Sequence, residues 1–152
     1  MNHLTEATIS KHEIDALMSA FFSAVSFKEG GQPGYHKLDQ IFVESGRLIK
    51  ASSTVPEIST VSQFIEPRQH MVDSGELTCF QEIETAEITE WFGNVAHRLS
   101  TYEKYGIKQG AEVGGRGIIS TQFILTEAGW KISSMAWDDE RPGLTLPDRY
   151  RK

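Results

Sequence analysis

The groups in this chain that could transfer protons or bind metal are five histidines, one cysteine and a run of glutamates. The histidines are His3, His12, His36, His70 and His97, and none is paired at the short spacing of a metal site. Cys79 is the only cysteine, which excludes an intrachain disulfide and a cysteine-rich zinc site. The sequence therefore predicts no metal and no other cofactor.

His97 is the strongest candidate for chemistry near neutral pH. It lies in "WFGNVAHRLSTYEKYG", residues 91–106, where alternation predicts a strand. Val95, His97 and Leu99 share one face and include the larger aliphatic side chains, so we expect His97 to point towards the helices and Arg98 away from them. Three interpretations stay open: a core histidine, an acid or base in a pocket, and a metal ligand.

The glutamates form a stripe on the preceding segment, at positions 82, 84, 87 and 90. A solvated strand face is the simplest interpretation, and paired catalytic carboxylates are the alternative. Glu82 or Glu84 could also pair with Arg98 or Arg116 on an adjacent strand.

Helices are predicted in the first half of the chain. Apolar residues recur at helical spacing over residues 10–27, with Ser10 and Glu13 as a capping pair. A short helix is expected over residues 35–42, and a strand over residues 46–53. Thr60 and Gln63 predict the start of another helix, which we expect to break or kink near Pro67.

The second half is typical of strands. Residues 77–92 and 95–105 form one predicted hairpin through Gly93 and Asn94, and residues 117–125 and 129–137 form another. The glycine-rich stretch between the hairpins, residues 106–117, is predicted to be a mobile loop. Trp130 and Trp137 are seven residues apart, which places them on opposite faces of one strand. Helices followed by a strand meander indicate an α+β domain.

Composition sets the class of protein. The chain has 152 residues, 39% of them hydrophobic and 24% charged, as expected for one globular domain over residues 1–152. Its net charge of −6 argues against a nucleic-acid partner. No segment has the length of a membrane span or the pattern of a secretion signal, so we expect no membrane contact and a cytoplasmic location.

Three motifs carry a resemblance to a known superfamily. "FGNVAHRLSTYEK", "GRGIISTQF" and "GWKISSMAWDDE" resemble patterns of small SnoaL-like bacterial proteins in the nuclear transport factor 2-like superfamily, which includes ketosteroid isomerase. The resemblance covers about residues 8–140 and leaves a C-terminal tail, residues 141–152.

The resemblance implies a cone-shaped α+β fold, in which N-terminal helices pack in the concave face of a curved, mainly antiparallel sheet. It also implies a pocket inside the cone, and a homodimer through the outer sheet face that would cover Trp137 and Tyr102. Ketosteroid isomerase needs a carboxylate base and a tyrosine on the first helix. In this chain the position of the base falls near Lys50 or Ala51, and that of the tyrosine falls at Phe21 or Phe22. The absence of both groups argues against steroid isomerisation.

These observations predict a mainly apolar pocket for a small organic ligand. His97 would be its acid or base, in a lyase, isomerase or cyclase; a non-catalytic binding or dimerisation module is the alternative. Arg116 or Tyr35 would orient a polar group, and His70 and Glu82 are secondary candidates. The predicted apolar walls are Phe21, Phe22, Phe64 and Phe123.

Overall fold

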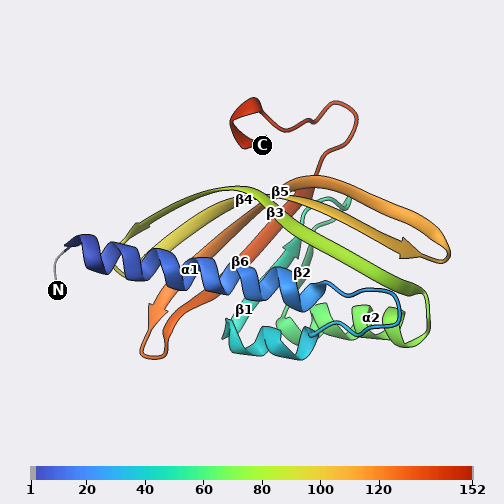
Figure 1. The fold of residues 1–152 in the computed structure, drawn as a ribbon, viewed down its shortest axis with the longest axis horizontal. Coiled ribbons are helices and arrows are strands. Elements are labelled where there is room, and N and C mark those ends of the chain that lie inside the picture. The colour runs from blue at the N-terminus through green and yellow to red at the C-terminus, as the bar shows by residue number, and fades with distance from the viewer. Residues whose placement is uncertain (1–2, 152) are drawn as a thin grey trace.

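A curved six-stranded sheet with helices on its concave side forms the frame of the molecule (Figure 1). The structure is a computed structural model and describes residues 3–151. The strand order is β2-β1-β6-β5-β4-β3, and every neighbouring pair is antiparallel except β1 with β6. The predicted α+β class with a curved, mainly antiparallel sheet is confirmed. In chain order, the elements are α1 (His3–Val25), the 3-10 helix η1 (Tyr35–Gln40), β1 (Phe42–Lys50), β2 (Glu57–Ser59), α2 (Val61–Asp73), β3 (Leu77–Phe92), β4 (Val95–Lys108), β5 (Ala111–Thr126), β6 (Gly129–Asp139) and the 3-10 helix η2 (Asp148–Tyr150).

Helix α1 crosses the concave face and begins earlier than predicted. Ser10 lies inside the helix, so it is not the cap. Its hydroxyl instead accepts a hydrogen bond of 3.3 Å from the indole Nε1 of Trp130 on β6. Ile14 and Met18 are fully buried against the sheet, as expected for the apolar stripe of an amphipathic helix.

Helix α2 has the predicted start but not the predicted break. The Gln63 amide donates to Thr60 Oγ1 at 3.1 Å, and the Gln63 side chain accepts from the Thr60 amide at 2.9 Å, which completes a capping box. The helix then continues through Pro67. Both Pro67 and Gln63 are exposed, so water can bond to the carbonyl that the proline ring leaves without a donor.

The segment predicted as a mobile loop is instead a third hairpin. β4 continues to Lys108 and β5 begins at Ala111, leaving Gln109 and Gly110 as a two-residue turn. Their φ angles are 52° and 77°, and positive φ at both positions is the requirement of a type I′ turn. The low apolar content of this segment led to the prediction of a loop, whereas its two turn residues specify a pair of strands.

The two faces of β4 are opposite to the prediction. Arg98 is only 4% exposed and faces α1, whereas His97 points outwards with half of its side chain exposed. Two carboxylates make the burial of Arg98 possible: its Nε and Nη2 donate to Glu84 at 3.0 and 2.5 Å, and its Nη1 donates to Asp15 of α1 at 2.6 Å. A count of aliphatic residues could not reveal a buried charge whose partners come from other elements.

A β-bulge in β6 places the two tryptophans on the same face of the sheet. Gln122 of β5 pairs with Ser134, but the next residue, Phe123, pairs with Ile132, so Ser133 is an extra residue. The alternation shifts by one there, and Trp130 and Trp137 both face the concave side. The prediction that they lie on opposite faces is wrong, and Trp137 needs no cover from a second subunit.

The C-terminal segment after β6 runs over the convex side of the sheet, opposite α1 (Figure 1). The Thr101 hydroxyl donates to the Tyr150 carbonyl at 2.7 Å, and Leu146 is buried. The tail therefore covers part of the outer face.

The buried arginine gives a direct test of this face assignment. We expect Arg98→Met to lower the free energy of unfolding by about 3 kcal/mol, because Glu84 loses its partner in a desolvated site. The matched change at the exposed neighbour, His97→Ala, should alter it by less than about 0.5 kcal/mol. Urea denaturation measures both values, and a larger loss for His97→Ala would reverse the assignment of faces.

Candidate functional site

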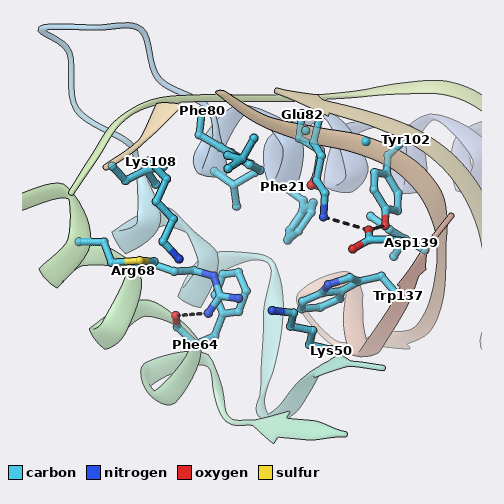
Figure 2. Close-up of a pocket in the computed structure, with 18 of the residues that line it drawn as sticks. Phe21, Lys50, Phe64, Arg68, Phe80, Glu82, Tyr102, Lys108, Trp137 and Asp139 are labelled. Carbon is cyan, nitrogen blue, oxygen red and sulfur yellow. Dashed lines mark hydrogen bonds and ion pairs between the residues drawn. The ribbon is translucent and has the colours of Figure 1, made fainter. Parts of the chain in front are cut away.

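A cavity of about 450 Å³ lies between the helices and the concave face of the sheet (Figure 2). α1, η1, α2 and five of the six strands contribute lining residues. Helix α1 supplies Phe21 and Val25, while α2 supplies Phe64, Arg68 and Met71.

Aromatic side chains form much of the wall. The Phe64 and Trp137 rings meet edge to face, with centroids 6.0 Å apart. Phe64 is held by the buried side of α2, and Trp137 reaches it because of the bulge in β6. The aromatic lining residues are Phe21, Tyr35, Phe64, Phe80, Tyr102 and Trp137.

A polar cluster occupies the sheet side of the cavity. The Tyr102 hydroxyl donates to the Asp139 carboxylate and lies 3.2 Å from the Asp138 carbonyl, and Lys104 Nζ donates to Asp139 at 2.9 Å. Burial, together with the hydrogen bond to Asp139, raises the pKa of Tyr102 above its ordinary value. The phenol therefore stays protonated and acts as a donor.

Gly117 on β5 makes room for this cluster. A Cβ at that position would lie 2.4 Å from the Tyr102 hydroxyl oxygen and 2.2 Å from the Asp138 carbonyl oxygen. Both contacts are far shorter than van der Waals separation. The absence of a side chain at Gly117 thus allows Tyr102 to reach Asp139.

Glu82 on β3 is the group in the cavity best suited to exchange a proton at neutral pH. Its pKa is raised to about 7, mainly by burial and also by nearby Asp139, while Lys104 and Arg68 oppose the shift. None of the side chains that the structure describes donates a hydrogen bond to its carboxylate, and Ser26 bonds to its backbone. An acid with such a pKa in a partly apolar cavity is a candidate general acid or base.

Three further cations line the cavity at a distance from this cluster: Lys50, Arg68 and Lys108. The Arg68 guanidinium lies over the Phe64 ring, 3.7 Å from its centroid, and Nη1 donates to the Phe64 carbonyl at 3.0 Å. Burial lowers the pKa of Arg68 from its ordinary high value.

The structure brings four of the predicted site residues together and leaves five outside. Phe21, Tyr35, Phe64 and Glu82 line the cavity. The other five are His97, Arg116, His70, Phe22 and Phe123.

The residues left outside have separate reasons for their positions. His97 is on the convex face, where Nε2 lies 2.8 Å from Glu90. Arg116, elsewhere on β5, pairs with Glu140 at 2.6 Å. His70 is exposed in the last turn of α2. Phe22 and Phe123 are buried in the core without lining the cavity. His97 is therefore not positioned to act on a ligand there.

Sequence reasoning missed most of the polar groups. Tyr102 and Lys104 share the alternation of Arg98, so correct placement of Arg98 would have turned both inwards. Arg68 follows Phe64 by one helical turn, a spacing that places them on the same side of α2. Trp137 and Asp139 could not be placed without the bulge.

The described residues show neither the pattern of a metal site nor that of a membrane-spanning helix. Among the side chains that the structure describes, no group of three or more histidine, cysteine, aspartate or glutamate residues could hold a metal ion. The described helices also include none with the length and apolar character of a bilayer span.

Comparisons with known proteins identify the fold. No protein-family model and no curated protein matches the sequence. Among solved structures, a nuclear transport factor 2-like superfamily protein from Salmonella enterica aligns with a TM-score of 0.72 and 14% identity, over 89% of this chain and 94% of that one. A putative aromatic ring hydroxylase from Novosphingobium aromaticivorans gives 0.71 and 16%, over 89% and 92%.

A third structure, a putative calcium/calmodulin-dependent kinase II association domain from Exiguobacterium sibiricum, gives a TM-score of 0.66 and 12% identity, over 90% of this chain and 95% of that one. The chain has the nuclear transport factor 2-like fold that the motifs predicted. At these identities the likeness establishes the fold and no activity.

The raised pKa of Glu82 predicts a pH dependence of stability. The folded state holds this proton more tightly than the unfolded state, where the pKa is near 4.5, so Glu82 lowers stability as the pH rises from 4.5 towards 7. Relative to the wild type, we expect Glu82→Gln to gain on the order of 2 kcal/mol in unfolding free energy between about pH 4 and about pH 8.

Urea denaturation across this pH range measures the difference. Glu103→Gln, on the exposed face of β4, is the matched control for the loss of one carboxylate. A constant difference between Glu82→Gln and wild type at all pH values would contradict the raised pKa.

Proposed function

We propose that the cavity binds a small, mainly apolar organic molecule and that Glu82 exchanges a proton with it. The observation that carries this proposal is the Glu82 carboxyl group, which faces an aromatic cavity with a pKa raised to about 7. At neutral pH both of its protonation states are populated, so it can accept a proton in one step and return it in another.

The neighbouring Lys104 supplies the second element of such chemistry. One N–H of its ammonium group binds Asp139, and two further N–H donors remain for a ligand oxygen. When a proton leaves a carbon atom next to a carbonyl group, negative charge develops on the carbonyl oxygen, and a nearby cation stabilises that charge. We therefore place the reaction among the isomerases, lyases or cyclases that can use this combination.

The dimensions of the cavity support a ligand of one or two rings. Its volume of about 450 Å³ falls in the range of sites for small molecules, and aromatic side chains form part of its wall. Flat apolar rings pack well against such walls.

A larger side chain that fills the cavity tests whether ligands bind there. We expect Met71→Trp, which adds an indole on the cavity side of α2, to abolish binding of small organic molecules that bind the wild type. His70→Trp, one residue earlier on the exposed side, should keep binding unchanged. Thermal-shift screening of a library of aromatic and alicyclic compounds, followed by calorimetry, measures both variants. Equal binding to the wild type and Met71→Trp would place the ligand elsewhere.

Compounds from the same screen that the protein converts to product allow proton transfer to be measured separately from binding. Glu82→Gln should lower kcat by about 100-fold or more, with a change in ligand Kd below about threefold. His97→Ala should leave both values near those of the wild type. If kcat is unchanged in Glu82→Gln, Glu82 is not the acid or base, and only the binding role of the cavity remains.

A second candidate function, association with another copy of the chain, is supported by the convex face of the sheet. Exposed apolar side chains on β3 and β4 include Ile83, Ile88, Val95 and Tyr105. Exposed apolar patches of this kind are typical of interaction surfaces. Tyr102 and Trp137 would not be part of this dimer interface, because both face the cavity.

The cytoplasmic location stays a prediction.

The dimer is tested on this face. We expect Ile88→Glu to shift the molecular mass measured by light scattering from dimer to monomer at micromolar concentration, because a buried unpaired carboxylate opposes association. Val55→Glu, in the exposed segment between β1 and β2, is the control. A monomeric wild type would contradict the proposed dimer.

A further inference from the structure

The three cations opposite the polar cluster come from three different elements. Lys50 ends β1, Arg68 lies in the middle of α2, and Lys108 ends β4. Figure 2 shows their nitrogen ends directed towards the same part of the cavity. Three like charges repel one another, so this convergence is unfavourable unless negative charge lies between them.

The carboxylates that line the cavity do not supply that charge. Asp139 is bound by Lys104 at 2.9 Å, and Glu140 is bound by Arg116 at 2.6 Å. Glu82 is partly protonated at neutral pH because burial raises its pKa to about 7. One end of the cavity is therefore cationic in a chain whose net charge is −6.

The lysines have only weak partners outside the cavity. Lys50 lies 4.0 Å from Glu57, and Lys108 lies 3.8 Å from Glu76. These distances exceed those of hydrogen-bonded ion pairs, and all four side chains are about one-third exposed or more. Both ammonium groups can turn to an anion in the cavity at little cost.

Arg68 is the central group of the three. It is half-buried, and within residues 3–151 no carboxylate lies at ion-pair distance from it. Its Nη1 donates a hydrogen bond to the Phe64 carbonyl, and its planar face lies over the ring of Phe64. A guanidinium oriented in this way presents N–H pairs that match the two oxygens of a carboxylate.

We infer that the ligand is a small aromatic carboxylic acid bound as its anion, with its carboxylate on Arg68 between Lys50 and Lys108. This inference rests on the proposed function and adds the ligand class and its orientation. The ring system would lie along Phe64, Trp137 and Phe21, and the end far from the carboxylate would approach Glu82 and Lys104.

Two probes that share a ring system and differ in one group, a carboxylate or a carboxamide, test the inference. The anion 2-naphthoate and the neutral 2-naphthamide share one ring system, so their Kd values measured by calorimetry isolate the contribution of the carboxylate. We expect 2-naphthoate to bind the wild type at least about tenfold more tightly. In Arg68→Gln this preference should disappear, with little change for 2-naphthamide.

Two controls accompany this experiment. Arg47→Gln removes an exposed arginine of β1 that does not line the cavity, and it should keep the preference. The double variant Lys50→Gln/Lys108→Gln should reduce the preference without touching the Arg68–Phe64 stack, so it replaces Arg68→Gln if that variant fails to fold.

The outcomes separate this inference from the proposed function. Equal binding of the two probes, or tighter binding of 2-naphthamide, overturns the anion site and leaves the cavity proposal standing. Screening hits that are all neutral, with no binding of either naphthalene, overturn the inference in the same way. If neither probe binds and Met71→Trp changes no binding, both proposals fail.

Discussion

The guanidinium of Arg98, buried between the sheet and α1, is the interaction on which the positions of the other elements depend. A buried cation is tolerated only with carboxylates at hydrogen-bond distance, and β3 and α1 each supply one. The pairing to Asp15 fixes α1 across the concave face, and the pairing to Glu84 aligns β3 with β4. Phe21 and Val25, further along α1, reach the cavity because the helix is held in this position.

Because Arg98 and alternate residues after it on β4 face inwards, the cavity has two electrostatically different ends. Tyr102 and Lys104 continue the inward alternation from Arg98 and meet Asp139 from β6 in a compensated cluster beside Glu82. The other end, with Arg68, has cations whose carboxylate partners are distant. An elongated molecule with one charged terminus would therefore have a single favourable orientation, and a neutral molecule would have no such constraint.

Some local signals in the sequence predicted the local structure, whereas the predictions of a Ser10 cap and of a break at Pro67 were wrong. The Thr60 capping box, the turn at Gly93 and Asn94 and the strand meander are confirmed, since each depends on residues close in the chain. The face of β4 and the bulge at Ser133 could not be predicted, because each depends on partners from distant elements. The cations of the cavity show the same limit: Lys50 and Lys108 end separate strands, and no spacing connects them.

The close approach of Gly117 to Tyr102 has a consequence for how this site should be recognised in other chains. The polar groups of the cavity are common residue types whose exchange leaves the backbone intact, whereas a methyl group at Gly117 would displace the tyrosine ring from Asp139. A position that presents no side chain to a ligand thus limits which substitutions the site tolerates. A glycine opposite the inward tyrosine is a more selective signature than any one ionisable group.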